Sequence, residues 1–347
     1  MPCHGPITRS PIAYDFKMLL AGDVGGTKTL IGLYQPERER PRPLVVREYA
    51  TMDFDSLDDV VEVFLEDTNA ARKVRAGCVG VAGPVTGQVA RLTNGGWLAD
   101  AAVLAARLDD APVQLLNDLE AMAYAVPVLE PDELAVLQKG VASPTGNAAL
   151  IAAGTGLGEA LLHNLNGRFV PSASEGGHAD FAARTPRELA LVPELVRHYG
   201  RADVERVVSG PGLVNLFRFT HGTEDLRKAC RALGPDLDAA EMPAAITTSA
   251  LEGRCEQCAE ALDMFVEAYG SEAGNLALRA VATAGVYIGG GIAPKILPAL
   301  QSVLFIDAFR DKEPMTHMLR TLPVHVILNS AAGLLGAAVR ASTLHAV

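Results

Sequence analysis

The chain has 347 residues, of which 49% are hydrophobic and 20% are charged, a composition typical of a soluble globular protein of about two domains. Its 30 basic and 41 acidic residues give a net charge of −11, which argues against nucleic acid or a membrane surface as a partner, because both favour a basic face. No apolar run reaches the roughly 20 residues of a membrane span, and five scattered cysteines do not form a disulfide framework, so we expect a cytoplasmic protein.

The first half of the chain begins with strands and continues with alternating helices and strands. Residues 1–17 contain three prolines and no periodic pattern, so we expect a flexible N-terminal tail. Strands are predicted at Met18–Gly22, Thr29–Tyr34, Leu44–Ala50, Ala76–Ala82 and Val113–Leu116, and helices at Ser56–Ala70, Ala101–Leu108 and Leu119–Val126. This order predicts an α/β fold with a mixed sheet.

The pattern starts again after Gly140, where Ala148–Ala153, a Gly/Thr turn and Glu159–His163 repeat the opening scheme of strand, turn and strand. The remaining predicted elements are helices at Arg187–Leu233 and Leu251–Ala284, strands at Gly285–Ile288 and Val324–Leu328, and a closing helix at Ser330–Leu344. Two similar halves predict two lobes with a cleft between them. We expect a small α/β domain of residues 18–128 plus 331–347 and a large α/β domain of residues 129–330.

The turn GDVGGTKT at Gly22–Thr29 resembles a P-loop but does not match it, because Thr27 stands where that motif requires glycine and a strand follows instead of a helix. A glycine-rich hairpin can still direct its N–H groups at phosphate oxygens, and Asp23 can hold Mg²⁺ directly or through water. The alternative is an ordinary hairpin with glycines at positive φ.

Two further glycine-rich turns lie in the second half. The turn GTGLG at Gly154–Gly158 is not a dinucleotide fingerprint, because Glu159 replaces the last glycine, but two facing hairpins of this kind could clamp a polyphosphate. The run Gly289–Gly291 lies between a strand and a helix that Pro294 can begin. Such backbone lets a flat ring or a ribose approach closely, and close packing of helix on sheet is the alternative.

Several polar residues have the chemistry of a sugar site. Asp118 follows Asn117 at the carboxyl end of a strand, where it can take a proton from a hydroxyl, although spacing alone favours an N-cap. Glu175 and His178 share a glycine-flexed loop and can bind vicinal hydroxyls, but two ligands are too few for zinc. Glu205 is by itself an ordinary helix acid.

Two further features can be explained by structure alone as well as by function. Cys255 and Cys258 form one C-x-x-C in a helical, charged stretch with no second pair, which favours a surface helix face over zinc or redox chemistry. Trp97, the one tryptophan, can stack on a sugar or pack in the core.

Eight segments together resemble the bacterial glucokinase family, within the hexokinase–actin–Hsp70 class of ATP-binding folds. In order they are GDVGGTK (22–28), TNGGW (93–97), LLNDLEAMA (115–123), AAGTGLG (152–158), SEGGHADF (174–181), ERVVSGPGLVNL (205–216), YIGGGIAP (287–294) and SAAGLLGAA (330–338). They cover nearly the whole chain from Met18. The resemblance implies a two-lobed, actin-like ATPase (ribonuclease H-like) fold with a central cleft.

The same resemblance implies that the chain transfers the γ-phosphate of ATP, with Mg²⁺, to the 6-hydroxyl of glucose, as the entry step of glycolysis. By that likeness Asp118 is the catalytic base, in place of an N-cap, and the lobes close over the sugar. The implied sugar ligands are Asn94, Asn117, Glu175, His178 and Glu205. The implied nucleotide ligands are Gly22, Asp23, Gly25, Gly26, Thr27, Lys28, Gly154, Thr155, Gly156, Gly289, Gly290 and Gly291. The family likeness also suggests a homodimer.

The chain departs from the family pattern in places. Lys28 stands where many relatives have asparagine, which can add a phosphate contact, and Asn94 is followed by two glycines, which leaves fewer side chains near the sugar. Ala179–Arg184 has no cysteine, so the zinc cluster of the related repressor–kinase family is not expected there. The alternatives are a kinase for mannose or glucosamine, a sugar sensor without catalysis, and a chaperone-like ATPase.

Overall fold

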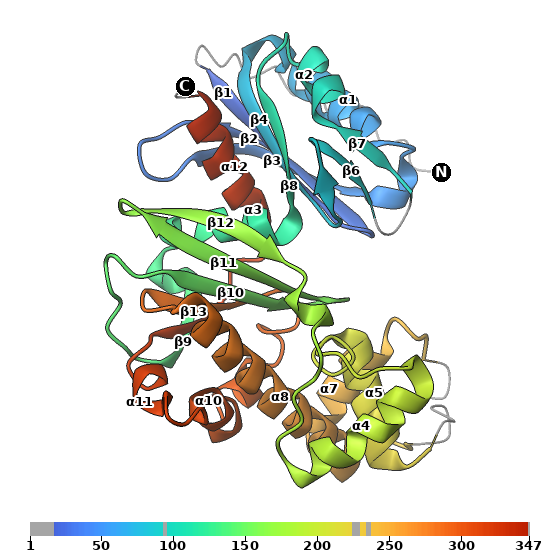
Figure 1. Ribbon diagram of the computed structural model, residues 1–347. Coiled ribbons are helices and arrows are strands. Elements are labelled where there is room, and N and C mark those ends of the chain that lie inside the picture. The colour runs from blue at the N-terminus through green and yellow to red at the C-terminus, as the bar shows by residue number, and fades with distance from the viewer. Residues whose placement is uncertain (1–16, 93–95, 224–229, 234–236, 346–347) are drawn as a thin grey trace. The chain divides into compact units, whose positions relative to one another are not determined.

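The computed structural model describes residues 17–92, 96–223, 230–233 and 237–345 (Figure 1). The predicted tail up to residue 16 and the predicted sugar ligand Asn94 lie outside these ranges. The chain divides into two compact units, Met1–Val128 with Ala331–Val347, and Leu129–Ser330. Within the described residues, no helix is both long enough and apolar enough to span a lipid bilayer.

The first unit contains a five-stranded sheet in the order β3-β2-β1-β4-β8. Its strands are β1 (Met18–Val24), β2 (Lys28–Gln35), β3 (Arg42–Ala50), β4 (Val74–Val81) and β8 (Val113–Asn117). β1 is antiparallel to β2 and parallel to β4, which is parallel to β8. The carboxyl ends of β1, β4 and β8 therefore lie at one edge of the sheet.

Helices cover both faces of this sheet, which explains why β1 is apolar up to Gly22 (Figure 1). Met18 and Leu20 pack in the cluster that includes α1 (Leu57–Thr68) and α2 (Ala101–Arg107), and Leu19 and Ala21 pack in the cluster that includes α12 (Ala332–His345). α3 (Asp118–Ala125) packs on α12. A small sheet joins β5 (Val85–Thr86), β6 (Val89–Arg91) and β7 (Leu98–Asp100).

The second unit contains a six-stranded sheet in the order β12-β11-β10-β13-β14-β9. Its strands are β9 (Leu134–Gln138), β10 (Ala148–Ala153), β11 (Leu157–Leu165), β12 (Arg168–Ser174), β13 (Gly285–Gly289) and β14 (Val324–Ile327). β10 is antiparallel to β11 and parallel to β13. This is the arrangement of β1 with β2 and β4, so the predicted repeat of strand, turn and strand is confirmed.

The long helix α8 (Glu256–Ala280) runs through the core of the second unit, where Phe265 and Tyr269 are fully buried. Around it lie α4 (Pro186–Tyr199), α5 (Gly210–His221), α7 (Met242–Leu251), α9 (Leu297–Leu300), α10 (Val303–Arg310) and α11 (Thr316–Leu319). Short 3₁₀ helices occupy Thr51–Asp53, Ala71–Lys73, Val126–Val128, Pro131–Glu133 and Gly176–His178.

Three predicted segments differ from the observed elements. The stretch from Arg187 contains two helices, because Gly200 ends α4 in a left-handed conformation with φ 78° and Ser209 begins α5 as its N-cap. The helix predicted from Leu251 begins at Glu256 and ends at Ala280. Pro294 begins no helix, because the residues after Gly289 form turns up to Ile296.

Candidate active site

Two carboxylates lie at one edge of the sheet of the first unit. Asp23 is close to the carboxyl end of β1, and Asp118 directly follows β8. Between them, a Cβ at Gly80 of β4 would stand 2.7 Å from Cβ of Ala121 and 3.6 Å from Cα of Asp118. The lack of a side chain at Gly80 therefore lets α3 pack closely on the sheet, and this packing places Asp118 at the edge.

The half-buried carboxylate of Asp23 lies against the first turn of α12, because a Cβ at Gly333 would be 2.6 Å from its Oδ2. Burial and the negative charge of Asp118 raise the pKa of Asp23 to about 6, against a lowering by Lys28. A carboxylate whose charge is disfavoured by burial and by a second carboxylate fits a divalent cation, which would offset both effects. The residues at this edge are therefore suited to Mg²⁺, which prefers carboxylate oxygens.

At the start of α3, the neighbouring residues Asn117 and Asp118 differ in what their side chains do. Asn117 is the N-cap, and its Oδ1 accepts a hydrogen bond from the N–H of Leu119 at 3.0 Å. Its Nδ2 donates to the carbonyl of Gly83 at 3.3 Å. The N-cap that spacing favoured for Asp118 was therefore wrong, because Asn117 occupies that position. Asp118 is exposed at the first helical position, and its Oδ1 accepts the same Leu119 N–H at 2.8 Å, which orients the carboxylate.

The turn between β1 and β2 is a tight hairpin in which the N–H of Gly25 donates to the carbonyl of Lys28 at 3.0 Å. Neither Gly25 nor Gly26 has a positive φ, so the positive φ expected for an ordinary hairpin was wrong at these two glycines. Gly22 is required by packing, since a Cβ there would lie 2.8 Å from Val79 Cγ1. The exposed Lys28 forms an ion pair with Glu48 at 2.9 Å, and Thr27 is exposed beside it.

The second unit brings its glycine-rich segments together at one edge of its own sheet. Gly154–Gly156 follow β10, and Gly289–Gly291 follow the adjacent parallel strand β13. Gly290 has φ 84°, and a Cβ there would lie 2.4 Å from the carbonyl of Ala153. The hydroxyl of the buried Tyr269 accepts the N–H of Ala153 at 3.1 Å and reaches the carbonyls of Ile151 and Gly289, each at 3.4 Å. Both turns are thus fixed close to one another.

Glu205 connects the first of these turns to the loop that carries Glu175 and His178. Its Oε2 accepts the N–H of Leu157 at 2.9 Å, and its own N–H donates to the carbonyl of Gly177 at 2.8 Å. Glu175 Oε2 and His178 Nε2 are 4.0 Å apart, and both side chains are exposed. Three side chains able to bind hydroxyl groups therefore lie on adjoining segments of one unit.

Comparison with known proteins gives a consistent answer. The sequence model of the Glucokinase family matches residues 20–344. A glucokinase of Synechocystis sp. is 37% identical over 93% of this chain and 97% of its own length, and one of Nostoc sp. is 38% identical over 94% and 99%. A crystal structure of glucokinase from an Antarctic psychrotroph superposes with a TM-score of 0.82 at 29% identity and covers 95% of this chain and all of that one.

This chain belongs to the glucokinase family. It has the two-lobed, actin-like α/β fold of sugar kinases, and it is an ATP-dependent hexose kinase. The resemblance of eight sequence segments to this family is therefore confirmed. Within each unit, the structure brings the predicted residues to one sheet edge: Asp23 and Asp118 in the first, and the glycine turns with Glu205 in the second.

One acidic residue of this glucokinase-family chain was missed by the sequence analysis. Glu159 of β11 is only 1% exposed, and a Cβ at Gly176 would lie 2.1 Å from its Oε2, so it lies directly behind the Glu175–His178 loop. Burial and Glu272 raise the pKa of Glu159 to about 7, while Arg279, 3.7 Å away, lowers it. A carboxylate among the otherwise apolar residues 157–162 was the sequence signal that could have singled it out.

The structure also decides two further questions that the sequence left open, on Trp97 and on the cysteine pair. Trp97 packs in the core of the first unit, where it is 4% exposed and donates its Nε1–H to the carbonyl of Phe54 at 3.1 Å. The surface helix face predicted for Cys255 and Cys258 was wrong for Cys258, which is fully buried. Apolar neighbours from α5 and α7 cover this end of α8, and the sequence gives no local sign of that packing.

Proposed function

We propose that the chain phosphorylates glucose at its 6-hydroxyl with MgATP, and that Asp118 is the general base. The observation that carries the proposal is the carboxylate pair of the first unit, in which burial and the charge of Asp118 raise the pKa of Asp23. One member can bind a cation while the other accepts a proton. A single carboxylate could not perform both tasks at once.

Asp118 suits the base because it is exposed and because a backbone N–H holds its Oδ1 in place. Proton removal by a positioned group contributes about 10²–10⁴-fold in rate. The rest of the acceleration in phosphoryl transfer comes from positioning and from neutralising charge on the phosphates. When bound, Mg²⁺ supplies part of that neutralisation, and Asp23 is the residue that would hold it, directly or through water.

In the second unit, we assign the sugar hydroxyls to Glu175, His178 and Glu205, and the phosphates and nucleoside to the turns at Gly154–Gly156 and Gly289–Gly291. The exposed Glu175 and His178 support the first assignment, since a ligand can reach them. The unobstructed backbone at Gly154, which has no heavy atom within 4 Å of a would-be Cβ, supports the second. The reaction further requires a closing movement when sugar binds, which excludes water as a competing nucleophile.

The test is a coupled assay of ADP release by the full chain with MgATP and glucose, mannose, glucosamine or no sugar. We expect one ADP per glucose 6-phosphate formed, and a sugar-free rate below about 1% of the glucose rate. Binding of glucose without turnover would identify a sensor instead. Hydrolysis that does not depend on sugar would identify an ATPase of another kind.

A further inference from the structure

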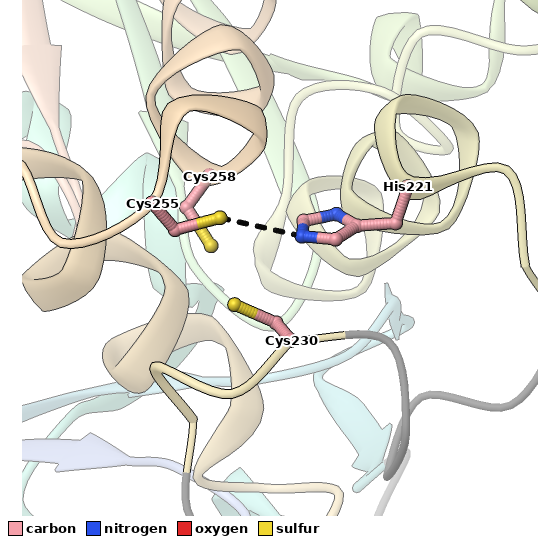
Figure 2. Close-up of side chains that lie close together, drawn as sticks. All are labelled: His221, Cys230, Cys255 and Cys258. Atoms are coloured by element: carbon pink, nitrogen blue, oxygen red, sulfur yellow. Dashed lines mark hydrogen bonds between the residues drawn. The ribbon is translucent and has the colours of Figure 1, made fainter.

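Three cysteines and one histidine of the second unit meet at the beginning of α8 (Figure 2). Cys255 is the N-cap of α8 and Cys258 lies in its first turn, while His221 is the last residue of α5 and Cys230 comes from the segment between α5 and α7. Their sulfur and imidazole nitrogen atoms all lie within 4.8 Å of one another. Four ligand atoms from three separate segments therefore surround one point.

The spacing of these atoms matches a tetrahedral metal site. Zinc binds thiolate sulfur at about 2.3 Å and imidazole nitrogen at about 2.0–2.1 Å, so tetrahedral geometry separates S from N by about 3.6 Å and two sulfurs by about 3.8 Å. The Sγ of Cys255 is 3.5 Å from Nε2 of His221. This pair already has the tetrahedral separation, and the other pairs, none more than 4.8 Å apart, would approach by about 1 Å at most to hold the ion.

The imidazole of His221 is fixed in the tautomer that a metal ligand requires. Its Nδ1 lies 2.9 Å from the carbonyl of Phe217, which can only accept a hydrogen bond, so Nδ1 carries the proton. The lone pair of Nε2 then faces the cysteines, as Figure 2 shows. The Phe217 ring packs on the imidazole at 4.0 Å between centroids, which restrains the ring further. A histidine held through its second nitrogen is typical of metal sites.

The residues around the cluster hold the end of α5 against the start of α8. The hydroxyl of Thr220, next to His221, donates to the carbonyl of Gln257 at 2.9 Å and so joins the end of α5 to the start of α8. Cys258 is fully buried and Cys230 is 8% exposed, while His221 and Cys255 are partly buried, so the site lies at the edge of the core. Four protein ligands with no open position are the mark of a structural zinc site, whereas a catalytic one keeps a position for water.

We propose that His221, Cys230, Cys255 and Cys258 bind one Zn²⁺ as a structural site that joins the end of α5, the Cys230 segment and the start of α8. Soft thiolate ligands in tetrahedral geometry select zinc over the oxygen-seeking Mg²⁺ of the kinase reaction. The site is independent of the proposed catalytic residues. It takes no part in phosphoryl transfer.

The first experiment measures the metal content of the full chain, expressed in zinc-containing medium and purified without a histidine tag or chelator. We expect about one zinc per chain in the wild-type protein and less than about 0.2 in Cys255→Ser, Cys258→Ser and His221→Gln. Cys78→Ala and His163→Gln are the matched controls, since both residues lie outside the cluster, and they should keep the metal. Loss of zinc should also lower the Tm by roughly 5 °C or more.

A second experiment needs only the wild-type chain, so it stands even if a variant fails to fold. A mercurial reagent titrated into the zinc-loaded protein should release zinc in proportion to the thiols that react, and Co²⁺ in place of zinc should give the absorption of a tetrahedral thiolate complex. Wild-type protein that takes up no zinc under reducing conditions would overturn the proposal. So would zinc retained by Cys255→Ser, or a Cys255–Cys258 disulfide, seen as the loss of two hydrogens, in protein purified under reducing conditions.

Discussion

The hairpin β1–β2 of the first unit and the hairpin β10–β11 of the second have the same topology and different chemistry. Each pairs antiparallel within itself and adds a parallel strand, β4 or β13, beside its first strand. At the second-last residue of its first strand, one unit has Asp23 and the other has Ala152. Carboxylates therefore gather at one sheet edge and bare backbone at the other.

This difference shows how one repeated arrangement of strands can suit two different tasks in a reaction. The acidic edge can hold a cation and remove a proton, whereas the glycine edge can approach phosphates and a nucleoside closely. The acid that the second hairpin lacks is supplied by Glu205, from outside the hairpin, and it bonds to the turn through Leu157 N–H. The comparison predicts separable effects when each edge is altered.

The largest effect is expected at the acidic edge. Asp118→Asn keeps the shape of the side chain but cannot accept a proton, so we expect kcat to fall at least about 10²-fold while glucose affinity stays within about tenfold. Steady-state kinetics and glucose titration measure the two quantities. Asp67→Asn, an exposed acid of α1, is the control and should behave as wild type. A near-normal kcat in Asp118→Asn would remove this residue from the role of base.

The next effect is expected at the sugar loop. Glu175→Gln removes a charged acceptor for a hydroxyl, so the KM for glucose should rise about 10–100-fold while kcat changes little. The KM for ATP should stay within about twofold. Glu252→Gln, an exposed acid of the same unit, is the matched control. An unchanged KM for glucose would contradict the assignment of Glu175.

A smaller effect separates packing from ligand contact at the glycine edge. A Cβ at Gly156 would lie 2.7 Å from Glu205 Oε2, whereas a Cβ at Gly154 would meet nothing within 4 Å. Gly156→Ala should therefore displace Glu205 and lower the Tm by about 2–4 °C, while Gly154→Ala should leave the Tm unchanged. If phosphates approach this turn, Gly154→Ala should still raise the KM for ATP several-fold. No change in that KM would move the phosphates away from Gly154.

The last effect concerns stability against pH and leaves the reaction aside. The pKa of Asp23 rises from 3.8 to about 6 on folding, so the folded state disfavours its charge. The stability linked to this group is complete below pH 3.8 and is lost as the pH rises through 6. Asp23→Asn cannot ionise and should raise the Tm by roughly 2–5 °C at pH 8 without Mg²⁺, and by less at pH 5. Equal shifts at both pH values would show that Asp23 carries no buried charge.

Much of the fold follows from sequence where local signals agree with packing. Apart from Asp23, the strand Met18–Val24 is apolar because helices cover both faces of the sheet. Ser56, where a helix was predicted to begin, caps α1, with the Asp59 N–H donating to its Oγ. The strand β12 was missed although Asn166 and Gly167, with φ 55° and 83°, form the two-residue hairpin turn that this dipeptide favours.

The candidate site was less accessible to sequence reasoning. The spacing could not distinguish Asn117 from Asp118 as the N-cap, since both side chains can accept the same N–H. The pKa of Glu159 depends on its burial and on the charges of Glu272 and Arg279, which are more than a hundred residues away in the sequence. The cysteine cluster likewise joins His221 to Cys255 across the fold, so no local C-x-x-C rule could predict it.

Tyr269 fixes α8 to the sheet of the second unit. Its hydroxyl contacts three backbone groups around the ends of β10 and β13, and Cys258 lies about three turns away on the same helix. A helix fixed at its start and near its middle passes a displacement at one of these points on to the other. Loosening of the cysteine end would therefore disturb the three main-chain contacts that Tyr269 makes at β10 and β13.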